Sequence, residues 1–107
     1  DVPHSHAAAE RAVALARDGS VGALMKGSLH TDELLAAVVA REDGLRTERR
    51  LSHCFVLDVP LYHKLLVVTD AAINILPDLE AKADVARNAI DRCRALVIER
   101  PKLAVQA

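Results

Sequence analysis

Three stretches of the chain repeat apolar residues with the period of a helix, and each is bounded by residues that start or stop helices. Residues 5–17 are rich in alanine and end at an Asp-Gly pair. Residues 31–44 begin with a hydroxyl and two acids and end at Gly44, and residues 78–96 begin with Asp78. The pattern therefore predicts three helices. The positions expected to be buried are Leu34, Leu35, Val38 and Val39 in the second, and Leu79, Ala83, Ala86, Ile90 and Cys93 in the third.

Four shorter apolar runs separate these helices and predict strands. Residues 21–25 follow a turn and indicate a buried parallel strand. Residues 52–58 and 64–69 are joined by the short link 59–63, which favours an antiparallel pair, with the second strand buried. Residues 102–107 predict one more strand. The order of elements predicts an α/β fold, a layered sheet with helices on its faces.

Length and composition indicate one folded domain. A chain of 107 residues has room for one core, so we expect residues 1–107 to form a single unit. Hydrophobic residues make up 51% and charged residues 27%, which is typical of a globular chain and not of a disordered one. The net charge of -1 provides no overall field that would attract nucleic acid or an anionic membrane.

The residue content also argues against several classes of protein. Tyr62 and Phe55 are the only aromatic residues, which argues against a base-stacking surface. The apolar runs are far shorter than the roughly 20 residues of a membrane span, and residues 1–10 lack a secretory signal. Cys54 and Cys93 lie far apart without a CxxC motif. We expect reduced thiols, small and buried, in a cytoplasmic protein.

The histidine spacing does not predict a metal site. The chain has five histidines, His4, His6, His30, His53 and His63. Metal binding requires three or four converging donors, and apart from the His4-x-His6 pair these positions show no established spacing. We expect no metal.

The loop between the first predicted strand and the second predicted helix is a candidate anion site. It contains Lys26, Gly27 and Ser28 and leads to Thr31. A glycine lets the backbone approach a ligand, and a helix N-terminus presents free N–H groups to an anion. The spacing of a P-loop is absent, so a capped helix after a turn is the alternative reading.

A basic segment follows the second predicted helix. Arg46, Arg49 and Arg50 lie within five residues of one another and could bind phosphate groups through forked donors. A solvated charged loop is the alternative. Ser52 and His53 are adjacent and would point to opposite faces of a strand, so they do not form a nucleophile and base pair.

A third candidate lies directly after the strand at residues 64–69. Open sheets place ligands at the carboxyl ends of their strands. Asp70 could position a reacting group there, and Asn74 could donate a hydrogen bond to an oxyanion. A carboxylate that stabilises a turn is an equal or better interpretation.

Three segments together resemble a known family. They are LMKGSLHTDELL (24–35), GLRTERRLSHCFVLDVPLYHK (44–64) and TDAAINILPDLEAKADVARNAIDRCRAL (69–96). Their residues, order and spacing resemble the middle of the phosphate acetyltransferase and phosphate butyryltransferase family, over roughly residues 7–105. Relatives have further segments on both sides, so the resemblance implies an incomplete copy.

The resemblance implies acyl transfer, acyl-CoA plus phosphate giving acyl phosphate plus coenzyme A. Coenzyme A and phosphate would be substrates, and no cofactor would be bound. It also implies a two-domain phosphate acyltransferase-like architecture, with the site in the cleft between domains, and a homodimer. The MKGSLHTDELL and GLR-x3-R-x-SH patterns are more similar to the butyryl-type branch.

The resemblance also implies roles for individual residues. The substrate-binding residues would be Lys26, Gly27, Ser28, His30, Thr31, Arg46 and Arg50, and the catalytic residues Ser52, Asp70 and Asn74. Leu61 and His63 stand where the family commonly has glycine and proline, which leaves the shape of that loop open.

Two other interpretations differ in how well they suit this sequence. A non-catalytic module that binds coenzyme A or another anion, or an association domain, could keep the fold without half of the cleft. An oxidoreductase on a related two-domain architecture would need nicotinamide and carboxylate metal motifs, and the sequence shows neither.

Overall fold

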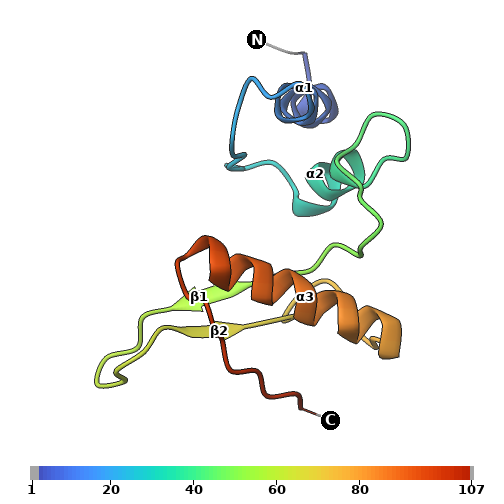
Figure 1. Cartoon of the computed structure of the whole chain (residues 1–107). Helices are drawn as coiled ribbons and strands as arrows, with labels where there is room; N and C mark the ends of the chain where they lie inside the picture. Colours follow the sequence, from blue (N-terminus) through green and yellow to red (C-terminus); the bar gives the residue numbers. More distant parts are fainter. Residues whose placement is uncertain (1–2, 107) are drawn as a thin grey trace. The chain divides into compact units, whose positions relative to one another are not determined.

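A computed structural model describes residues 3–106 of the chain. It contains three helices and two strands in the order α1, α2, β1, β2, α3 (Figure 1). The described residues fall into two compact units, which divide between Glu48 and Arg49. Each unit is described by itself below.

Helix α1 spans Ser5–Arg17, as the sequence predicts. Its N-cap is His4, whose Nδ1 accepts a hydrogen bond from the backbone N–H of Ala7 at 3.2 Å. The helix ends before Gly19, which has a φ of 80° and therefore suits glycine. Its contacts with α2 form the helical part of the first unit.

Helix α2 spans Thr31–Val38 and is shorter than predicted. It ends early because the chain turns back, and the N–H of Leu45 donates to the carbonyl of Val38 at 2.7 Å. Gly44 allows this turn, since a Cβ there would lie 2.4 Å from the Ala40 carbonyl oxygen. Three residues of the expected stripe, Leu34, Leu35 and Val38, are half-buried, whereas Val39 is 40% exposed, because it follows the last turn of the helix.

Two predicted strands are irregular in the structure. Residues 21–25 form no strand, and Met25 is 97% exposed. Residues 102–106 form none either, and residue 107 lies outside the described part. A strand is stabilised by hydrogen bonds to a neighbouring strand, and within residues 3–106 neither segment has such a partner. The prediction of strands at both places was wrong for the described chain.

The second unit contains one antiparallel strand pair. Strands β1 (Phe55–Leu57) and β2 (Leu66–Val68) pair with Phe55 opposite Val68 and Leu57 opposite Leu66. The antiparallel pairing confirms the prediction, but both strands are shorter. The expected burial of the second strand was wrong, because most residues of the pair are exposed on this two-stranded sheet.

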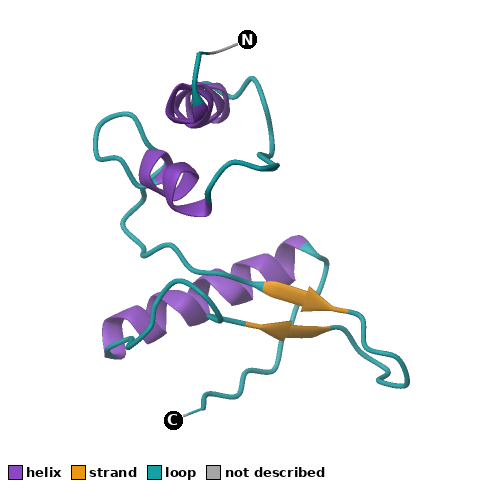
Figure 2. Ribbon diagram, turned by 180° about the vertical axis from the view of Figure 1, so that it is seen from behind, coloured by secondary structure: helices purple, strands orange, loops and turns teal. Residues whose placement is uncertain are grey.

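Helix α3 spans Leu79–Ala95 and runs alongside the two strands (Figure 2). Asp78 caps it, since its Oδ1 accepts from the N–H of Ala81 at 2.8 Å. The buried residues of α3 are Ala81, Val85, Ala89 and Cys93. Of the expected positions, Cys93 is buried, Ala83, Ala86 and Ile90 are half-buried, and Leu79 is 83% exposed. The buried face is therefore rotated from the predicted one, which was wrong for Leu79.

Helices and a small antiparallel sheet occur together, which confirms the mixed α/β content. No helix within the described residues has the length and apolar character that crossing a membrane requires.

Candidate functional site

The carboxylate of Asp70 organises the loop after β2. Its Oδ1 accepts the backbone N–H groups of His53 at 3.1 Å, Ala72 at 3.2 Å and Ile73 at 3.1 Å. Its Oδ2 accepts both the backbone N–H of Asn74, at 2.9 Å, and the Asn74 side-chain amide. The loop is therefore folded around this one side chain.

These hydrogen bonds change the acidity of Asp70. Partial burial raises the pKa of the carboxyl, but the hydrogen bonds from Asn74, Ala72, Ile73 and His53 outweigh it and lower the pKa to about 2. A carboxylate with such a pKa is a weak base near neutral pH. Its chemistry suits a residue that shapes the site better than one that takes up a proton.

Asn74 links this loop to the segment that precedes β1. Its side-chain nitrogen donates to the carbonyl of Leu51 at 3.0 Å as well as to Asp70. Both amide hydrogens are thus used inside the protein. Asn74 holds the loop after β2 against the backbone between Arg50 and Ser52.

Arg50 and Ser52 are held from another side by α3. The N–H of Arg50 donates to Asp84 Oδ2 at 3.0 Å, and the side-chain amide of Asn88 donates to the Arg50 carbonyl and to Ser52 Oγ, both at 2.9 Å. Ser52 is half-buried and Arg50 is exposed. The backbone of this segment is fixed while the Arg50 side chain stays accessible.

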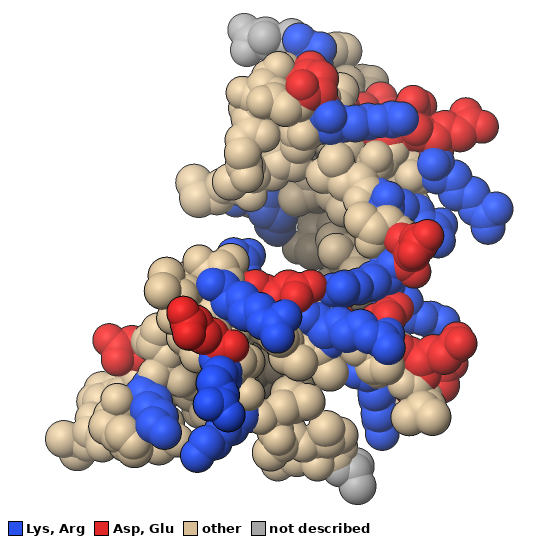
Figure 3. Space-filling model, in the orientation of Figure 1, with Lys and Arg blue, Asp and Glu red and all other residues tan. Residues whose placement is uncertain are grey.

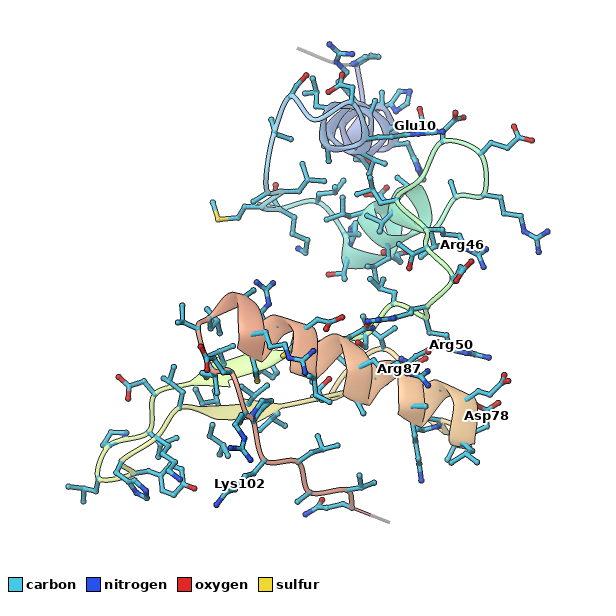
Figure 4. The ribbon with its side chains drawn as sticks, in the orientation of Figure 1. Glu10, Arg46, Arg50, Asp78, Arg87 and Lys102 are labelled. Carbon is cyan, nitrogen blue, oxygen red and sulfur yellow. The ribbon has the colours of Figure 1, made fainter. Side chains whose placement is uncertain are left out.

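Arg50 and Asn74 line one small hollow. Its volume is about 290 Å³, and it lies at the start of α3; its lining residues are Arg50, Ile73, Asn74, Ile75, Leu76, Pro77, Asp78 and Ala81. This is near the lower end, about 300 Å³, of typical small-molecule sites. Figure 4 labels Asp78 at the start of α3 and Arg50 alongside the helix. Among the described residues, the Arg50 guanidinium forms no salt bridge, so it is available to an anion.

The remaining predicted residues belong to the first unit. Lys26 is exposed, and its Nζ donates to the carbonyls of Gly27 at 3.2 Å and Leu29 at 2.8 Å. The ammonium thus closes its own loop and keeps one N–H for another acceptor. Ser28 is exposed in the same loop. A Cβ added at Gly27 would meet nothing within 4 Å, so the local fold does not require glycine at this position.

The loop ends at the start of α2. His30 is the N-cap residue but makes no side-chain cap, and Thr31 is the first helical residue. Asp32 and Glu33 lie in the first turn, as predicted. Arg46 is exposed after the turn that closes α2.

The structure thus brings four predicted residues of the second unit together: Arg50, Ser52, Asp70 and Asn74. Sequence reasoning missed Asp84 and Asn88, which hold two of them. Their spacing, one turn apart beside the buried Val85 and Ala89, was the available signal, because polar residues bordering a buried face often bond to a neighbouring segment.

Cysteines and metal ligands add little to this site. Cys54 and Cys93 are free, and Cys93 is buried whereas Cys54 is half-buried. Partial burial and the neighbouring Cys93 raise the pKa of Cys54, which disfavours a reactive thiolate. In the part of the chain that is described, no group of three or more His, Cys, Asp or Glu side chains is arranged to hold a metal ion.

Comparison with known proteins decides the family. The family model described as phosphate acetyl/butaryl transferase matches residues 5–107. The chain belongs to this phosphate acetyl/butyryl transferase family. The resemblance stated from the three sequence segments is therefore confirmed.

Individual family members are similar over nearly the whole chain. A phosphate acetyltransferase of Rhizobium meliloti is 60% identical over 105 residues, covering 98% of this chain and 33% of that protein. A phosphate acetyltransferase of Rickettsia felis is 59% identical, covering 85% of this chain and 26% of that protein. A phosphate butyryltransferase of Clostridium acetobutylicum is 37% identical, covering 95% and 34%.

The chain thus spans about a quarter to a third of the length of these family members. The identities do not support the expected closeness to the butyryl-type branch, since the acetyltransferases from Rhizobium and Rickettsia match better. A phosphate acetyltransferase of Thermotoga maritima is only 30% identical, so identity does not follow the name of the acyl group.

Proposed function

We propose that this chain is part of an enzyme that transfers a short acyl group between coenzyme A and inorganic phosphate. Acyl-CoA and phosphate would give acyl phosphate and coenzyme A. The observation that carries this proposal is the family match over residues 5–107, together with 60% identity to a protein named phosphate acetyltransferase.

The reaction makes two demands on the site. A phosphate oxygen attacks the thioester carbonyl carbon, and a C–O bond forms. The C–S bond then breaks as sulfur leaves with the electron pair, and the thiolate takes up the proton that the phosphate loses. The negatively charged phosphate must be bound next to the thioester by groups that offset its charge. The carbonyl oxygen must be stabilised as it becomes negative.

In the second unit, Arg50 meets the first demand. Arg50 lines the hollow, and its permanently charged guanidinium, which forms no salt bridge among the described residues, can bind phosphate through two parallel hydrogen bonds. Ser52 suits the second demand, because its Oγ accepts from Asn88 and so keeps its O–H to donate to the carbonyl oxygen.

Asp70 and Asn74 take supporting roles in this proposal. Both amide hydrogens of Asn74 are donated to Leu51 and Asp70. The Asp70 carboxylate already accepts hydrogen bonds from within the protein. We therefore assign them to shaping the loop around the hollow, in place of the direct oxyanion contact expected for Asn74 from the sequence.

We propose that residues of the first unit also contact an anion, either phosphate or the phosphates of coenzyme A. The residues proposed are Lys26, Gly27, Ser28, His30, Thr31 and Arg46. The helix N-terminus after this loop favours negative charge. We propose the same wider setting as for the family: a two-domain subunit, a homodimer, a cytoplasmic location, and no nucleic acid, membrane or resident cofactor as a partner.

A second candidate is a non-catalytic module that binds coenzyme A or phosphate. The observation that favours it is the coverage, since the chain spans about a quarter to a third of the length of its relatives. Such a module would bind the substrates without turning them over.

One experiment separates these functions: phosphate-dependent release of coenzyme A thiol from acetyl-CoA and butyryl-CoA by the purified chain. Samples without phosphate correct for the thiols of Cys54 and Cys93. The acyltransferase predicts release that falls about 100-fold or more in Arg50→Ala. Lys82→Ala is the matched control, because Lys82 is an exposed cation on α3 outside the hollow, and should leave release unchanged.

The other outcomes are equally informative. A folded chain that binds coenzyme A without releasing thiol supports the binding module. A folded chain that binds neither phosphate nor coenzyme A contradicts both functions for this chain.

A further inference from the structure

Helix α3 carries a polar stripe beside its buried face. Asp84, Asn88 and Asp91 follow one another at about one turn, next to the buried Val85 and Ala89. Acidic and basic side chains are interspersed over the face where α3 lies (Figure 3). The three stripe residues differ from solvated charges because each bonds to the segment that precedes β1.

The stripe fixes the backbone of Arg50 at both ends of the residue. Asp84 accepts its N–H at 3.0 Å, and Asn88 donates to its carbonyl at 2.9 Å. Because both polar groups of one residue are bound to the same rigid helix, its backbone dihedral angles are held, and with them the direction of its Cα–Cβ bond.

The stripe also separates the two neighbouring arginines. Arg49 pairs with Asp91, with Nη1 and Oδ2 2.5 Å apart. Arg50, the next residue, lines the hollow. Arg49 is thus bound on the helix, while its neighbour Arg50 lines the hollow.

Asn88 contacts both residues to which the proposed reaction gives a direct part. Its single amide nitrogen donates to the Arg50 carbonyl and to Ser52 Oγ. The second bond occupies the acceptor side of the Ser52 hydroxyl, which leaves the hydroxyl hydrogen to point elsewhere. Asn88 itself does not line the hollow.

We propose that Asn88 is a positioning residue that sets Arg50 and Ser52 for binding the phosphate and the thioester carbonyl. This inference rests on the proposed function. It assigns to the polar stripe of α3 a role in phosphate affinity that acts through Arg50.

The test is a double-mutant cycle on binding of inorganic phosphate and of coenzyme A, measured by calorimetry on the whole chain. Asn88→Leu keeps the size of the side chain and removes both donors, and should weaken phosphate binding roughly 5- to 10-fold. Asn88→Gln keeps the amide and should recover part of the affinity. In an Arg50→Ala background, Asn88→Leu should have no further effect, because the residue through which it acts is gone.

A ligand-free measurement keeps the positioning claim separate from the proposed function. Hydrogen exchange at the Arg50 amide should become roughly fivefold faster in Asn88→Leu, since the segment loses one of its bonds to α3. Lys82→Ala is the control on the same helix. Asp84→Ala gives a second variant that loosens the same residue from its N–H side, should Asn88→Leu fail to fold.

Unchanged exchange at Arg50, or equal weakening of binding with and without Arg50, overturns the inference. If the unaltered chain binds neither probe, the proposed function fails, and the exchange rates alone then decide whether Asn88 holds Arg50 in place.

Discussion

Asn74 donates two hydrogen bonds to one oxygen of Asp70, one from its backbone N–H at 2.9 Å and one from its side-chain amide. A third bond, from the same amide to the Leu51 carbonyl at 3.0 Å, links this pair to the segment before β1. The relationship between these two residues gives the loop after β2 its shape and holds it beside Arg50.

Replacing Asp70 should therefore destabilise the second unit. In Asp70→Asn, one acceptor oxygen is replaced by an NH2 donor, which then faces N–H groups that are donors themselves. We therefore expect a loss of roughly 2–3 kcal/mol in the free energy of unfolding. Urea denaturation measures it. Asp58→Asn, at an exposed aspartate, is the matched control and should change stability little. Equal effects of the two changes would show that the hydrogen bonds of Asp70 do not hold the loop.

The same carboxylate predicts a dependence of stability on pH. The pKa of Asp70 is lowered from 3.8 to about 2 in the folded chain, so its stabilisation is complete above about pH 5 and is lost as pH falls through 3.8 toward 2. After allowance for solvent screening, the loss should be roughly 1–2 kcal/mol. The free energy of unfolding of the unaltered chain and of Asp70→Asn is measured from pH 6 to pH 2. Their difference isolates the contribution of Asp70, since the other carboxylates are common to both. A constant difference between the two would contradict the prediction.

Gly44 should be required for folding of the first unit. A Cβ there would lie 2.4 Å from the Ala40 carbonyl oxygen and 2.6 Å from the Val38 carbonyl oxygen, so backbone would have to move. We expect Gly44→Ala to cost roughly 1–3 kcal/mol, measured by thermal denaturation. Gly22→Ala is the control, because a Cβ there meets nothing within 4 Å. A similar melting temperature for both would contradict the close approach.

Gly27 should behave differently, because its role is proposed to lie in binding. The local fold leaves space for a Cβ there, so Gly27→Ala should change the melting temperature little. If the Lys26 loop binds phosphate groups through its backbone, the added methyl group should weaken coenzyme A binding roughly 10-fold. Calorimetry with coenzyme A measures this. Unchanged affinity would remove the loop from the proposed site.

The sequence predicted the local elements whose signals lie close together in the chain. Helix α1 has its predicted bounds, and α3 begins one residue after Asp78, because caps and helical periodicity act within a few residues. The antiparallel pairing of β1 and β2 followed from the short link between them. The three family segments likewise sufficed to predict the family.

Tertiary structure decided the features that depend on partners distant in the chain, namely which segments form strands and which residues are buried. Residues 21–25 and 102–106 are apolar, yet within the described chain they form no strand, because strands need neighbours to bond with. Leu79 has the character of a buried residue but is exposed, since the direction of α3 against the rest of its unit selects the buried face.

The candidate site shows the same division. Arg50, Ser52, Asp70 and Asn74 were chosen from local sequence patterns, but nothing local indicated that they meet. Asn88 and Asp84 hold the Arg50 segment from more than 30 residues further along the chain. By itself, the sequence determined the helices, the hairpin and the candidate residues. Folding decided which candidates share a hollow and which helix holds them, because those bonds join residues that are neighbours only in space.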